Sequence, residues 1–157
     1  MLRVGQTKDC RLNRRVRTTT GLLDERSPLP ALRFMKLAAP RTLLLVEDDP
    51  EIRDSIAEVL REAGRTVVCA SDGLDALAKL DVVERPCLIL LDLMMPRMDG
   101  IEFLRQLGKH PRSKDFPVLV LSAHATVQQA EVYPGVLGTL RKPFDIGQLL
   151  SWVDAHC

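Results

Sequence analysis

The chain has 157 residues, of which 46% are hydrophobic and 27% charged, a composition that excludes a wholly disordered protein and suits one domain with or without a tail. Aromatic residues make up only 4%, so a large stacking surface for single-stranded nucleic acid is not expected. The net charge of +1 excludes a globally basic protein but hides an asymmetry, because residues 1–41 carry ten Lys or Arg against three Asp or Glu, and residues 42–157 carry twelve against eighteen.

The charge asymmetry predicts two parts: a basic, flexible tail over residues 1–40 and a mildly acidic domain over residues 41–157. Three explanations of the tail stay open, namely an arm that binds a partner, an inert linker, and an artefactual start segment. The chain contains no apolar stretch of about 20 residues and no apolar core of signal-peptide length at its start. Its four cysteines form no metal-binding pattern, and Cys69 and Cys87 are expected to be buried free thiols. We therefore expect a cytoplasmic protein without a membrane span.

From residue 42 onward, short apolar runs alternate with segments whose apolar residues recur at helical spacing. The first helix is predicted to begin at Pro50 with Asp49 as its cap and to end at Gly64. A short helix is predicted over 126–133, with Thr126 and Gln129 as a capping box, and Asp145 is predicted to cap the last helix. Strands are predicted over residues 42–46, 66–70, 87–91, 118–121 and 136–140. Five strands that alternate with five helices predict an α/β fold with a parallel sheet.

Polar residues stand at or just after the predicted carboxyl ends of four strands: Glu47 and Asp48, Asp92, Ser122 and Lys142. Ligand sites of open parallel sheets form at this edge. Three carboxylates in one crevice repel each other and need a cation, and oxygen ligands favour Mg²⁺ or Mn²⁺. Together with a lysine and a hydroxyl, they suit phosphoryl transfer to a carboxylate, with Asp92 as the nucleophile.

Four runs of the sequence together resemble the receiver domain of two-component response regulators: LLLVEDDPEIR, LILLDLMMPRMDG, VLVLSAH and LRKPF. The resemblance covers about residues 42–156. It implies a flavodoxin-like (CheY-like) doubly wound sheet of five parallel strands in the order 2-1-3-4-5, with helices on both faces. We expect a stand-alone receiver, because no output domain follows within the sequence.

The resemblance also implies a role for each polar residue. Asp92 is the expected phosphoryl acceptor, and Ser122 and Lys142 are expected to contact the phosphoryl group, with a cis peptide bond between Lys142 and Pro143. Ser122 and Thr139 occupy the switch positions. The expected ligands of Mg²⁺, or of Mn²⁺, are Glu47, Asp48, Asp92 and the backbone carbonyl of Met94.

Thr139 departs from the family pattern, which usually has Tyr or Phe three residues before the lysine. The stretch from Ser122 to Lys142 is also about two residues shorter than usual, by comparison with that pattern, so the fourth helix is expected to be short. Two alternatives stay open: sequence drift with the switch retained, or a switch that works by ordering residues 122–133.

The function expected from these residues is Mg²⁺-dependent acceptance of a phosphoryl group on Asp92 in a phosphorelay. The donor would be a sensor histidine kinase or a histidine phosphotransfer protein, and the output an unidentified downstream protein. The chain would assist its own phosphorylation and dephosphorylation without being a turnover enzyme, since Met94 stands where aspartyl phosphatases carry a second acid. The alternative is a phosphate-independent scaffold with a receiver fold, and neither a membrane nor a nucleic acid is an expected partner.

Overall fold

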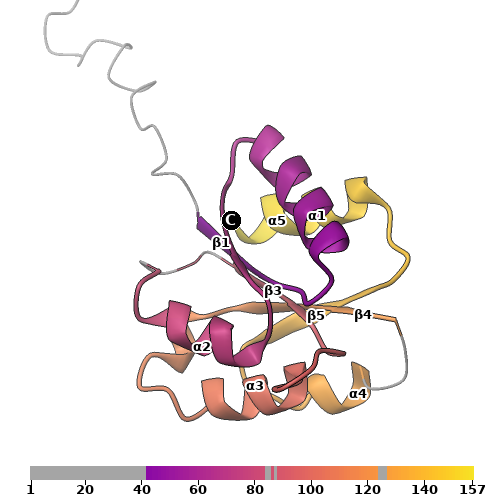
Figure 1. Ribbon diagram of the computed structural model, residues 1–157. Coiled ribbons are helices and arrows are strands. Elements are labelled where there is room, and N and C mark those ends of the chain that lie inside the picture. The colour runs from indigo at the N-terminus through magenta and orange to yellow at the C-terminus, as the bar shows by residue number, and fades with distance from the viewer. Residues whose placement is uncertain (1–41, 84–85, 87, 124–126) are drawn as a thin grey trace, which may run out of the picture. The chain divides into compact units, whose positions relative to one another are not determined.

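The computed structural model describes residues 42–83, 86, 88–123 and 127–157, which form a five-stranded parallel sheet with helices on both faces (Figure 1). The strand order is β2-β1-β3-β4-β5, which confirms the predicted fold class. The predicted tail over residues 1–40, the predicted thiol Cys87 and the predicted cap Thr126 lie outside the described residues.

The elements of the fold alternate along the chain as the apolar pattern predicts. The strands are β1 Thr42–Val46, β2 Thr66–Ala70, β3 Leu88–Asp92, β4 Val118–Ser122 and β5 Val136–Arg141. The helices are α1 Pro50–Glu62, α2 Gly73–Leu80, α3 Gly100–Leu107, α4 Val127–Ala130 and α5 Ile146–His156, and the 3₁₀ helix Ser113–Asp115 precedes β4. No helix in the described ranges is long and apolar enough to cross a bilayer.

The fourth helix is shorter than the predicted 126–133. It ends at Ala130, whose carbonyl accepts a hydrogen bond from the N–H of Tyr133 at 3.1 Å. Pro134 disfavours helical geometry at the residue before it, and Gly135 has a φ of 96°, which glycine adopts freely. The chain therefore turns directly into β5. The prediction that the fourth helix is short is confirmed, but the predicted range extends three residues too far at its C-terminal end.

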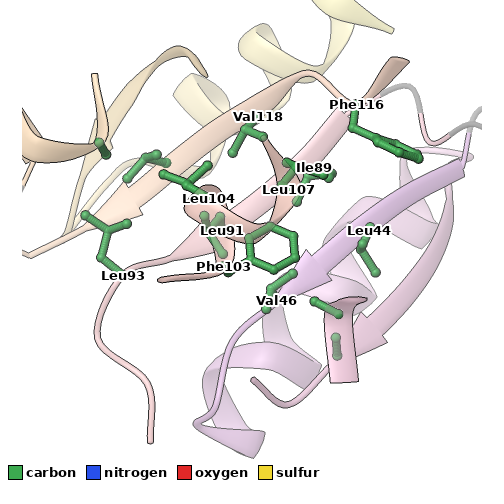
Figure 2. Packing of buried hydrophobic residues seen from close by; sticks show 14 of the residues in the cluster. Leu44, Val46, Ile89, Leu91, Leu93, Phe103, Leu104, Leu107, Phe116 and Val118 are labelled. Carbon is green, nitrogen blue, oxygen red and sulfur yellow. The ribbon is translucent and has the colours of Figure 1, made fainter. Parts of the chain in front are cut away.

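Each strand places alternate side chains on opposite faces of the sheet, so two separate cores form. Figure 1 shows α1 and α5 on one face and α2, α3 and α4 on the other. Leu43 and Leu45 pack with α1 and α5, whereas Leu44 and Val46 pack with α2 and α3. Figure 2 shows the second of these cores, in which Phe103 of α3 is fully buried. Strands β3 and β4 are buried throughout, and each is apolar up to the polar residue that ends it.

The outer edge of the sheet at β2 is covered by two side chains. Lys79 of α2 donates a hydrogen bond to the carbonyl of Cys69 at 2.6 Å, and Arg61 of α1 donates to the carbonyl of Val67 at 3.4 Å. Cys69 is a free thiol, as predicted. Its side chain is only partly buried, because β2 is an edge strand, and this corrects the prediction of a buried thiol.

Candidate functional site

Four of the predicted site residues converge at the carboxyl edge of the sheet. One carboxylate oxygen from each of Glu47, Asp48 and Asp92 lies within 4.8 Å of the other two. The Nζ atom of Lys142 lies 2.6 Å from Oε2 of Glu47 and 3.3 Å from Oδ2 of Asp92. Since β1 connects to β2 on one side and lies next to β3 on the other, the cluster stands at the topological switch point of the sheet.

Burial distinguishes this cluster from an ordinary group of surface acids. Glu47 is 1% exposed and Asp92 6% exposed, while Asp48 is partly exposed. Burial raises the pKa of the Glu47 carboxyl above its usual value; the hydrogen bond from Lys142 opposes this shift, and the charge of Asp92 adds to it. Burial alone would lower the pKa of Lys142, but Glu47 and Asp92 together raise it, so the lysine is a cation within a site that still holds excess negative charge.

The turn between β1 and α1 fixes the first two acids. Asp49 caps α1 by accepting hydrogen bonds from the N–H groups of Glu51 at 2.9 Å and Ile52 at 3.1 Å, so its side chain serves the helix, as predicted. Arg53 donates hydrogen bonds to the carbonyls of Glu47 at 3.0 Å and Asp48 at 3.3 Å. The sequence reasoning missed Arg53, whose one signal is its position a helical turn after the cap.

The end of β5 is joined directly to the end of β4. The N–H of Lys142 donates to the carbonyl of Ser122 at 2.8 Å, and the peptide bond from Lys142 to Pro143 is cis, which confirms that prediction. Ser122 is fully buried and pairs in register with Arg141. Thr139 lies within β5, partly buried and paired with Val120, three residues before the lysine.

The loop after β3 brings a backbone group to the acceptor. The N–H of Met94 lies 3.4 Å from Oδ1 of Asp92, while the Met94 side chain is 67% exposed. The N–H of Gly100 donates to the carbonyl of Leu93 at 3.0 Å, which closes the loop onto the end of β3. A Cβ atom on Gly100 would lie 2.5 Å from the carbonyl oxygen of Asp92, so only glycine fits this close approach.

The donor set fits a small, hard cation. All three side chains offer carboxylate oxygens, the ligands that Mg²⁺ prefers. Mg²⁺ binds oxygen at about 2.1 Å, so two ligands on opposite sides of the ion lie about 4.2 Å apart. No two of the three carboxylate oxygens lie more than 4.8 Å apart, which is of the same order as this separation.

Comparison with known proteins agrees with this geometry. Residues 43–154 match the family of the response regulator receiver domain. The chain belongs to this family. Receiver domains bind Mg²⁺ through acidic residues and, as parts of two-component response regulators, interact with histidine kinases.

Relatives and solved structures resemble this receiver domain over most of the described residues. The response regulator MprA of Mycobacterium ulcerans is 40% identical over 111 residues, which are 69% of this chain and 47% of MprA. The chain thus spans about half the length of that relative. The chemotaxis protein CheY4 of Vibrio cholerae is 31% identical, with a TM-score of 0.69 over 76% of this chain and 100% of CheY4. TrrA of Thermotoga maritima, in complex with Mg²⁺-BeF, is 26% identical, with a TM-score of 0.66 over 74% of this chain and 99% of TrrA.

Proposed function

We propose that Asp92 of this receiver domain accepts a phosphoryl group from a phosphorylated histidine of a sensor histidine kinase or a histidine phosphotransfer protein. The observation that carries the proposal is the position of Asp92 next to both the carboxylates of a candidate metal site and the ammonium group of Lys142. Two further carboxylates suited to a metal lie beside it, and the Lys142 ammonium lies 3.3 Å from one of its own oxygens. A nucleophile, a cation site and a fixed positive charge are the parts that phosphoryl transfer requires.

In the transfer, a carboxylate oxygen of Asp92 forms a bond to phosphorus as the bond from phosphorus to the imidazole nitrogen of the donor breaks. The leaving nitrogen keeps the bonding pair and takes a proton from water. Lys142 stabilises the charge on the transferred group, and the Ser122 hydroxyl donates a hydrogen bond to it. Glu47, Asp48, Asp92 and the Met94 carbonyl would hold Mg²⁺, which neutralises phosphoryl charge when bound.

The product is the modified protein itself, so the chain acts stoichiometrically and is not a turnover enzyme. The acyl phosphate carries about one and a half to two negative charges in place of the single charge of the Asp92 carboxylate, and it lies beside the carboxylates of Glu47 and Asp48. Such a change of charge at a packed edge shifts the balance between two conformations of the surrounding loops. We propose that this shift changes the affinity for a downstream protein, through Ser122 and Thr139.

Removal of Mg²⁺ is expected to abolish the modification. The protein, incubated with acetyl phosphate and Mg²⁺, should gain about 80 Da, the mass of HPO₃, in intact mass spectrometry. The same incubation with excess EDTA should give no adduct, because the uncompensated carboxylates repel the incoming phosphoryl oxygens. An adduct of equal yield in EDTA would contradict the proposal, and Mn²⁺ in place of Mg²⁺ should restore it.

The exposed side chain of Met94 predicts a long-lived phosphoryl group. A methionine offers no strong hydrogen-bonding group to orient an attacking water, so the adduct should persist well beyond seconds. Met94→Gln supplies such a group and should shorten the half-life by about tenfold, less than the factor of about a hundred or more that a positioned acid or base contributes. The control is Val82→Gln, at an exposed position just past the end of α2. Equal half-lives for all three proteins in a time course of intact mass would contradict this prediction.

A further inference from the structure

The loop between β3 and α3, residues 93–99, contains a strained residue. Arg97 has a φ of 64°, and the N–H of Met98 donates to the carbonyl of Pro96 at 2.7 Å, which closes a γ-turn centred on Arg97. Within the described residues, Arg97 is the only non-glycine residue with a positive φ. A side chain of this size is disfavoured there, and such a conformation persists only where neighbouring contacts impose it.

Those contacts come from the start of α2. The Arg97 guanidinium forms an ion pair with Asp72, a carboxylate that is fully buried. The other oxygen of Asp72 caps α2 by accepting a hydrogen bond from the N–H of Asp75 at 2.9 Å. The N–H of Gly73 donates to the carbonyl of Met98 at 3.2 Å, so two successive loop residues are tied to the same helix end. A buried carboxylate strongly favours a paired cation, and this preference holds Arg97 in its turn.

The opposite end of the loop is tied to the acceptor strand. The N–H of Gly100 donates to the carbonyl of Leu93, the N–H of Met94 points to Asp92, and the side chain of Met95 is buried in the core. Only Pro96 separates this anchored part from the γ-turn residue Arg97. The loop is thus held at both ends, and a release at Arg97 leaves the Met94 carbonyl restrained from the β3 side alone.

We propose that the ion pair between Arg97 and Asp72 positions the backbone carbonyl of Met94 for Mg²⁺. This inference rests on the proposed function, because it assigns a purpose to the loop only if a metal binds beside Asp92. Neither Arg97 nor Asp72 is part of the acidic cluster, and neither is joined to it by a hydrogen bond or an ion pair in the structure. Both are therefore positioning residues that act through the loop. They extend the site to a buried carboxylate that the sequence pattern assigned to no role.

The test measures metal affinity in the absence of any phosphoryl donor. Isothermal titration calorimetry of the protein with MgCl₂ should give a dissociation constant about tenfold higher for Arg97→Ala, the lower end of what partners outside the ligand shell contribute. Asp72→Asn should have a similar effect, since asparagine retains the helix cap but not the charge. Arg97→Gly should lose less than Arg97→Ala, because glycine adopts the turn without strain. Amide hydrogen exchange should show reduced protection over residues 93–99 in Arg97→Ala and Asp72→Asn.

The matched control is Arg105→Ala, which removes the same charge and breaks an exposed ion pair with Glu102 on α3. It should leave the dissociation constant of Mg²⁺ unchanged. Wild-type affinity together with wild-type exchange in Arg97→Ala and Asp72→Asn would overturn the inference and leave the proposed function intact. Failure of the wild-type protein to bind Mg²⁺ at all would overturn the proposed function, and this inference with it.

Discussion

Asp92→Asn is expected to gain no mass from acetyl phosphate and Mg²⁺ under conditions in which the wild-type protein gains about 80 Da. The amide has nearly the shape of the carboxylate, but it lacks the charge that makes the side chain a nucleophile and a metal ligand. Asp92 is 6% exposed and ends a strand that is buried throughout, so the substitution removes charge from the middle of the site without altering a surface contact. Intact mass spectrometry measures the result directly.

Two nearby substitutions control for a general loss of acidic charge. Asp49 and Asp99 are the N-caps of α1 and α3, and asparagine caps a helix about as well as aspartate. Asp49→Asn and Asp99→Asn should therefore both retain the full adduct. An adduct on Asp92→Asn would assign the acceptor to another residue. A downstream partner that binds wild type and Asp92→Asn equally, with and without phosphoryl donor, would support the phosphate-independent scaffold instead.

Gly100→Ala is expected to destabilise the protein by about 1–3 kcal/mol and to slow phosphorylation. The added Cβ would lie 2.5 Å from the carbonyl oxygen of Asp92 and 2.8 Å from Cα of Leu93. Both are backbone atoms, so the end of β3 must shift to make room, and the acceptor carboxylate shifts with it. Urea denaturation measures the free energy of unfolding, and the rate of the mass increase measures the effect on the site.

Gly108→Ala is the matched control for this substitution. Gly108 follows α3, has an ordinary φ of −61°, and a Cβ there would come no closer than 3.5 Å to another atom. Alanine should be neutral or stabilise the protein by up to about 1 kcal/mol, because it restricts the unfolded chain. If Gly100→Ala unfolds at the same urea concentration as Gly108→Ala, the added Cβ at residue 100 does not force the backbone shift that this prediction requires.

Much of the fold and the cluster follow from local sequence signals. Continuous apolar runs predict buried parallel strands, and the polar residue that ends each run falls at the ligand edge, so Asp92 and Lys142 could be placed together before their distance was known. The cap Asp49 was equally predictable, because Pro50 follows it at once. In each case the signal and the structure it specifies lie within a few residues of each other.

The features that sequence reasoning missed are contacts between distant segments or side chains without a motif. Arg97 and Asp72 are 25 residues apart, and nothing at either position signals the other. The Arg53 guanidinium donates to backbone carbonyls, so its position after the helix cap is the one sign of its role in the sequence. The length of α4 depended on how Pro134 and Gly135 compete with a helical pattern, a balance that the order of residues alone does not decide.

Lys79 and Arg61, whose side chains cover the outer edge of β2, affect how the protein can self-associate. An unprotected edge strand offers a template on which another chain can extend the sheet, and such growth leads to fibres. Here the outward carbonyls of Val67 and Cys69 already accept hydrogen bonds from Arg61 and Lys79, and both donors carry charge. A second molecule that adds a strand at β2 would have to displace two cations from their acceptors, so the protein resists polymerisation from that side even when crowded.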